Sequence, residues 1–104
     1  MAQRIVAYIP DLMDRSRLAS VPGVVFVAAP EALIDAAADA DAEVVVVDLS
    51  RPGVLEVLDR LGAARTIGFA SHVDTDLLTA ATAAGCTEVL PRSRFFATVA
   101  DRFG

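Results

Sequence analysis

Asp48 ends the most apolar run of the chain, four valines at positions 44–47, and a Leu-Ser-Arg-Pro-Gly segment follows it. A valine run without polar alternation is typical of a central parallel strand that is buried on both faces. In open parallel sheets, ligands and chemistry collect at the carboxyl ends of the strands. The sequence therefore predicts that the Asp48 carboxylate lies at a functional edge. There it either accepts a group or caps the neighbouring loop or helix.

Further reactive side chains follow other apolar runs. Asp11 and Asp14 come after the first run and could bind a metal, or could lie solvated in the first turn of a helix. Ser71, His72 and Asp74 have the residue types of a hydrolytic triad, but neighbours in one loop rarely reach the required geometry. We interpret His72 as a loop residue and Asp74 as the N-cap of the helix predicted at 74–84, and we do not expect an enzyme.

Apolar, β-branched runs alternate with Ala- and Leu-rich segments of helical length. Strands are predicted at 4–9, 24–28, 43–48, 66–70 and 88–90, and helices at about 11–20, 30–40, 53–62, 74–84 and 93–103. In the third helix, the spacing i, i+3, i+4 and i+7 predicts one buried stripe, formed by Val54, Val57, Leu58 and Leu61. This alternation predicts a doubly wound α/β fold with a parallel sheet covered on both faces.

Composition limits the function classes. The 104 residues suit a single domain spanning 1–104, and no run approaches the roughly 18 apolar residues of a membrane span. All nine basic residues are arginine, and the net charge of −5 gives no support for nonspecific nucleic-acid binding. The lone Cys86 has no partner for a disulfide or zinc site, so we interpret it as inert core in a reducing cytoplasm. No secretion signal is recognised.

Two stretches resemble the receiver domain of bacterial response regulators. "VVVVDLSRPG" with "VLEVLDRL" is similar to that family's phosphoacceptor strand and following helix, and "AAGCTEVLPRS" to its fifth strand and lysine loop. The resemblance covers nearly the whole chain. It implies a flavodoxin-like (βα)5 fold with strand order 2-1-3-4-5.

The resemblance also implies a phosphate site, of which only part is present. Asp48 matches the phosphoacceptor, and Ser71 and Arg92 are candidates for the phosphate pocket, Arg92 standing where the family has lysine. The acidic pair that holds Mg²⁺ is replaced by Ile9 and Pro10. Asp11 and Asp48 remain as candidate carboxylate ligands for the ion, but one displaced carboxylate is a poor substitute for the pair, so no cofactor is expected. The chain thus resembles a degenerate, or pseudo-receiver, domain.

Two functions follow from the resemblance. The favoured one is a receiver-like interaction module in bacterial signalling that lacks efficient Mg²⁺-dependent phosphorylation. The alternative is a working phosphoacceptor that uses Asp48 in a two-component phosphorelay. Partners would be another signalling protein or a histidine kinase, with no nucleic acid and no membrane.

A weak homodimer is a further expectation. Receiver domains commonly dimerise through the face formed by the fourth helix, fifth strand and fifth helix. In this chain the predicted interaction surface has an aromatic anchor among charged groups, namely Asp76, Arg92, Arg94 and Phe95. The alternative is that Phe95 packs against the edge of the fifth strand.

Overall fold

The strand that contains the valine run, β3 (Val44–Asp48), lies in the middle of a parallel sheet. The computed structural model describes residues 4–62 and 64–103. In it β3 pairs with β1 (Ile5–Tyr8) on one side and β4 (Arg65–Ala70) on the other, and every residue of β3 is buried. The prediction of a central strand that is apolar on both faces is confirmed.

The sheet has five strands in the order β2-β1-β3-β4-β5, and all pairs are parallel. The edge strands are β2 (Val24–Phe26) and β5 (Glu88–Pro91). The connection from β2 to β3 passes over β1, so the direction in which successive strands are added reverses between β1 and β3. This is the point at which open α/β sheets usually bind ligands.

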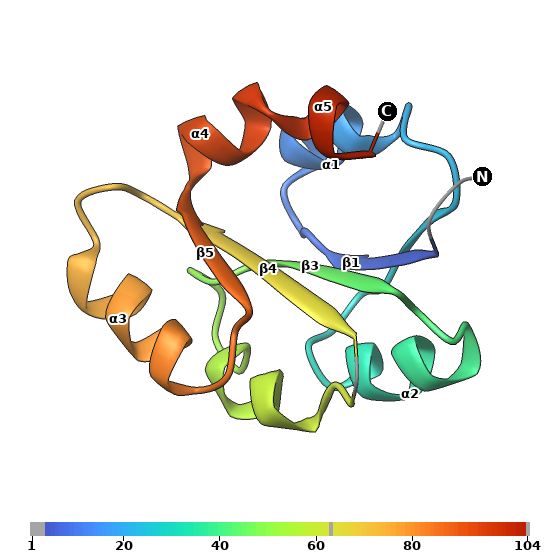
Figure 1. Ribbon diagram of the computed structural model, residues 1–104, viewed down its shortest axis with the longest axis horizontal. Coiled ribbons are helices and arrows are strands. Elements are labelled where there is room, and N and C mark those ends of the chain that lie inside the picture. The colour runs from blue at the N-terminus through green and yellow to red at the C-terminus, as the bar shows by residue number, and fades with distance from the viewer. Residues whose placement is uncertain (1–3, 63, 104) are drawn as a thin grey trace.

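Helices cover both faces of the sheet (Figure 1). One face carries α1 (Leu12–Leu18), α4 (Arg92–Ala97) and α5 (Val99–Phe103), and the other carries α2 (Ala32–Asp39), the 3-10 helix η1 (Leu55–Arg60) and α3 (Thr75–Ala83). The valines of β3 alternate between the two layers: Val45 and Val47 join the core under α2 and η1, while Val44 and Val46 join the core under α1 and α4. In the described parts of the chain, no helix could cross a bilayer.

The third predicted helix, 53–62, is a shorter 3-10 helix. Gly53 has a φ of +86°, so the turn after Pro52 delays the start of η1 to Leu55, and Gly62 follows the helix with a φ of +69°. The six residues of η1 connect these two turns, and 3-10 helices are frequent as such connectors. The predicted stripe of Val54, Val57, Leu58 and Leu61 is nevertheless buried.

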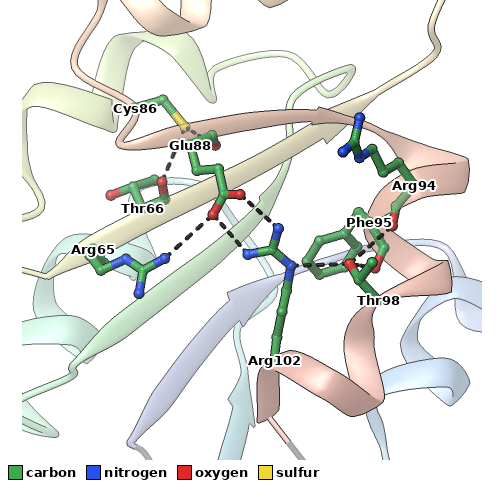
Figure 2. A network of polar contacts seen from close by, with 8 residues as sticks. All are labelled: Arg65, Thr66, Cys86, Glu88, Arg94, Phe95, Thr98 and Arg102. Atoms are coloured by element: carbon green, nitrogen blue, oxygen red, sulfur yellow. Dashed lines mark hydrogen bonds and ion pairs between the residues drawn. The ribbon is translucent and has the colours of Figure 1, made fainter.

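The last predicted helix, 93–103, is divided at Thr98 into α4 and α5. The Thr98 hydroxyl lies 3.0 Å from the carbonyl oxygen of Arg94 and 3.1 Å from that of Phe95. Such a side chain competes with the helical backbone hydrogen bonds. The Nε of Arg102 donates to the same hydroxyl, and its two terminal nitrogens lie 2.8 and 2.6 Å from the carboxylate of Glu88 (Figure 2). Arg102 therefore joins α5 to β5.

Candidate functional site

Asp48 lies at the carboxyl end of β3, and the turn that follows it occupies its carboxylate. The side chain is buried, and Oδ1 accepts hydrogen bonds from the backbone N–H of Ser50 at 3.0 Å and from its hydroxyl at 2.6 Å. The Nε of Arg51 lies 3.4 Å from Oδ2. Asp48 thus closes the loop after its own strand, as an aspartate does in an Asx turn.

Asp11 is the N-cap of α1. Its Oδ1 accepts from the backbone N–H groups of Met13 at 2.9 Å and Asp14 at 3.0 Å, which satisfies two of the free donors at the start of the helix. The hydrogen bond from Asp14 is the main cause that lowers the pKa of Asp11, and the positive charges of Arg51 and Arg92 act in the same direction. The carboxylate of Asp11 is therefore ionised, and its Oδ1 is used to cap α1.

Asp14 and Arg92 form an ion pair that the sequence did not predict. Asp14 lies on the inner side of α1, and its Oδ1 is 2.5 Å from a terminal nitrogen of Arg92, at the start of α4. The Asp14 side chain is 5% exposed and that of Arg92 44%. The hydrogen bond to Asp14 raises the pKa of Arg92. One signal was available: Asp14 stands four residues before the buried Leu18, on the same helical face.

Arg92 also lies against two aromatic rings. Its guanidinium carbon is 5.8 Å from the centroid of Phe69 and 5.5 Å from that of Phe96, within the range of cation–π attraction. The planar guanidinium can bind a carboxylate and face rings at the same time, which the compact ammonium of lysine does less well. Arginine at this position therefore fits the surroundings that this chain provides.

The structure brings most of the predicted site residues to one edge of the sheet. The negative charges of Asp11, Asp14 and Asp48 all stabilise the positive charge of Arg92. The positive charge of Arg51 in turn stabilises the ionised form of Asp11. We call these five residues the charged rim: Asp11, Asp14, Asp48, Arg51 and Arg92.

Ser71, His72 and Asp74 lie in the exposed loop after β4. The Oγ of Ser71 accepts from the N–H of Val73 at 3.4 Å. Asp74 takes the predicted N-cap position of α3, but its side chain makes no capping hydrogen bond. None of the side-chain hydrogen bonds found in residues 4–62 and 64–103 links these three residues to one another, so they are not arranged as a triad.

The rim is a poor match to the magnesium site that the resemblance implies. Ile9, where that site needs a carboxylate, is buried and apolar, and Pro10 follows it. Mg²⁺ requires several oxygen ligands in octahedral geometry. Over the described ranges, no three His, Cys, Asp or Glu side chains are grouped as metal ligands. The carboxylates present are instead bound by backbone N–H groups, a hydroxyl and arginines.

The predicted interaction surface needs a correction. Asp76 and Arg94 are exposed, but Phe95 is fully buried. Its ring stacks on Phe69 at 5.0 Å between centroids and meets Phe96 edge-on at 5.1 Å. Because α4 starts directly after β5, Phe95 falls one turn into the helix and points at the sheet. The prediction that Phe95 is an exposed anchor is wrong, and the remaining face is charged.

Cys86 is buried, as expected. Its Sγ lies 3.4 Å from the carbonyl oxygen of Thr66 and 3.2 Å from that of Glu88 (Figure 2). Burial raises the pKa of the thiol above its ordinary value. A neutral thiol in the core is a weak nucleophile.

Comparison with known proteins supports the architecture. No protein-family model and no curated protein sequence matches the chain. Among solved structures, it is similar to a two-component response regulator of the LuxR family from Aurantimonas sp. SI85-9A1, with a TM-score of 0.75 and 21% identity, covering 97% of this chain and 81% of that one. It is also similar to the signal receiver domain of NarL from Mycobacterium tuberculosis, with a TM-score of 0.71 and 16% identity, covering 97% and 95% of the two chains.

A third similar structure is the RcsB response regulator of Salmonella typhimurium. Its TM-score is 0.67 and its identity 16%, with 93% of this chain and 57% of that chain covered. Each of the three structures aligns with more than nine tenths of this chain. The chain therefore has the flavodoxin-like fold of response-regulator receiver domains, with the predicted strand order 2-1-3-4-5.

Proposed function

We propose that this chain is a receiver-like interaction module of bacterial signalling that works without efficient Mg²⁺-dependent phosphorylation. The observation that supports the proposal is that the carboxylates of the charged rim already have hydrogen-bond partners within the chain. Asp14 is bound by Arg92, and Asp48 is bound by Ser50 and lies beside Arg51. Asp48 and Arg92, which would handle a phosphoryl transfer, are each already bound by other residues of the chain.

The chemistry of phosphoryl transfer explains why this pairing matters. Catalysis consists mainly of positioning the reactants and neutralising the charge that develops on the transferred group, and a metal supplies much of that charge. An attacking carboxylate oxygen also needs a free lone pair directed at phosphorus. Here Oδ1 of Asp48 accepts two hydrogen bonds from Ser50, and Oδ2 faces the Nε of Arg51 at 3.4 Å. Both features favour binding over group transfer.

A working phosphoacceptor is the second candidate, and one observation favours it. Asp48 ends the central strand at the reversal of strand order, and Arg51 and Arg92 place two guanidiniums near its carboxylate. Arginine binds phosphate oxygens in a bidentate manner. In this version of the site, Arg92 would leave Asp14 and neutralise the phosphoryl group.

Intact-mass measurement separates the two functions. The protein is incubated with acetyl phosphate and Mg²⁺, with Asp48→Asn as the matched control and a chelator in a parallel sample. We expect little or no added phosphoryl mass. Stoichiometric labelling that disappears in Asp48→Asn would establish the phosphoacceptor function. If phosphoryl mass is added slowly and a chelator does not change the rate, arginine and not Mg²⁺ would neutralise the charge of the phosphoryl group.

The proposed partner is another signalling protein or a histidine kinase of a cytoplasmic pathway, and the module acts on it by binding. The homodimer is no longer supported by an aromatic anchor, because Phe95 is buried. Any self-association through the charged face would depend on Asp76, Arg92 and Arg94. Ion pairs between exposed side chains contribute little to the free energy of association. Sedimentation at high concentration is therefore expected to show a monomer.

A further inference from the structure

The buried carboxylate of Asp14 depends on Arg92. An ionised group that is almost fully removed from water requires a charged partner, and loss of that partner is strongly destabilising. Arg92 is the one charged side chain hydrogen-bonded to Asp14 in the parts of the chain that are described. The dependence is unequal, since 44% of the Arg92 side chain still reaches solvent.

The ion pair joins two elements that are 78 positions apart in the sequence. Asp14 belongs to α1, whereas Arg92 is the first residue of α4 and follows β5 without an intervening loop. The position of Arg92 therefore sets where the chain leaves the sheet.

Two further attachments hold the rest of the C-terminal segment. Phe95 packs in the core against Phe69, and Arg102 binds Glu88 with two hydrogen bonds (Figure 2). The contact between Arg92 and Asp14 differs from both, because it joins the start of α4 to α1 at the charged rim.

We infer that Asp14 is a positioning residue, the permanent counter-ion that keeps Arg92 and the β5-α4 junction in one place. A carboxylate that belongs to the chain cannot dissociate, so the junction does not depend on a removable ion at the rim. This inference rests on the proposed function in one respect: it takes the charged rim to be a structural element that binds no removable ion. The contact itself is independent of any phosphodonor.

Arg92 has other acidic neighbours once Asp14 is removed. Asp48 and Asp11 already act on its charge. Their own hydrogen bonds to Ser50, Met13 and Asp14 hold them in place, however, so neither can replace the lost contact fully. Truncation of Asp14 is therefore expected to release Arg92 and to leave a space lined by its guanidinium. A small carboxylate can enter such a space and restore the pair.

Hydrogen exchange of the whole domain tests the inference. In Asp14→Ala, amide exchange in residues 92–97 should accelerate about tenfold or more, because the start of α4 opens locally. Formate should restore much of the protection, whereas sodium chloride at the same ionic strength should not. Asp14→Glu should keep most of the protection. The matched control is Asp35→Asn, which changes an exposed carboxylate on the opposite face and should leave exchange in 92–97 as in the wild type.

The double variant Asp14→Ala with Arg92→Gln tests the mechanism. Formate should have no effect there, because its guanidinium partner is missing. Unchanged exchange in Asp14→Ala, or equal rescue by formate with and without Arg92, would overturn the inference. If Asp14→Ala folds only with formate, the inference is supported, and if formate does not restore the fold, it is overturned. The measurement needs no phosphodonor, so its failure would leave the mass test of the proposed function unaffected.

Discussion

Phe95 of α4 stacks on Phe69 of β4, with the ring planes 12° apart and the centroids separated by 5.0 Å. Phe96 meets both rings edge-on, at 5.1 Å from each. Offset stacks and edge-to-face contacts are the favoured geometries of aromatic pairs. The three phenylalanines therefore form a cluster that attaches α4 to the sheet directly below the charged rim.

Replacing Phe95 with alanine should act as a core deletion. Loss of a fully buried phenylalanine costs about 3–5 kcal/mol of unfolding free energy. For a domain of this size, each kcal/mol lowers Tm by roughly 4–8 °C. Thermal unfolding followed by circular dichroism should show a fall of more than about 12 °C. Phe95→Leu should fall by less, because it keeps more of the volume.

The neighbouring Arg94→Ala is the control for Phe95, since Arg94 is exposed on the same helix. Surface substitutions of this kind usually change stability by less than about 0.5 kcal/mol. A Tm of Phe95→Ala within a few degrees of the wild type would mean that Phe95 is not in the core, and would return it to the interaction surface.

The ion pair between Glu88 and Arg102 should make the domain less stable in acid. The hydrogen bonds from Arg102 lower the pKa of Glu88 below its ordinary value of 4.5, and Arg65 adds to the effect. A carboxyl whose pKa is lowered by folding stabilises the fold above its unfolded pKa, and this stabilisation disappears as the pH falls through the folded pKa. The contribution of Glu88 is therefore complete at neutral pH and is lost below about pH 4.5.

Urea unfolding of wild type and Glu88→Gln measures this contribution. At neutral pH the variant should be less stable by about 1–2 kcal/mol, the value of charge-assisted hydrogen bonds at a partly exposed site. The difference should shrink as the pH is lowered toward about 3. A difference that is independent of pH would show that Glu88 acts through packing and not through its charge.

Gly68 of β4 leaves room for a buried leucine. A Cβ at this position would lie 2.7–2.8 Å from three side-chain carbons of Leu49. Leu49 is itself 2% exposed, so it has little space into which it can move. Gly68→Ala should lower the unfolding free energy by about 1–3 kcal/mol, as overpacked core sites do. Gly68→Ala combined with Leu49→Ala should lose this clash, so the two changes should be clearly non-additive in urea unfolding.

The fold was predictable because local patterns and global topology agree. The valine run of β3 is apolar on both faces, which only a central strand of a covered parallel sheet requires. Gly62 and Gly85 both have positive φ angles at the ends of helical segments, where glycine is the residue that adopts this backbone conformation most easily.

The site was less predictable because it depends on long-range pairing. Asp48 and Arg92 could be placed at one edge from the strand order, but no periodicity relates Asp14 to Arg92 across 78 positions. The orientation of Phe95 depends on the break at Thr98, which divides the predicted helix 93–103 into α4 and α5. A periodicity counted across that break does not give the buried face of α4, and the count placed Phe95 outside the apolar stripe.

Cys86 should react slowly in the folded protein. Its thiol lies between the carbonyl oxygens of Thr66 and Glu88 and is buried, so a reagent reaches it when the surrounding structure opens locally. Burial also raises its pKa, which leaves the thiol neutral at neutral pH and removes the reactive thiolate. Labelling with a thiol reagent should be slower than in urea-unfolded protein by at least about a hundredfold. Glu88→Gln should accelerate labelling if Arg65 and Arg102 help to hold this edge closed, and the exposed-site variant Arg94→Ala is the matched control. Labelling of the native wild type as fast as that of the unfolded chain would contradict the buried position of Cys86.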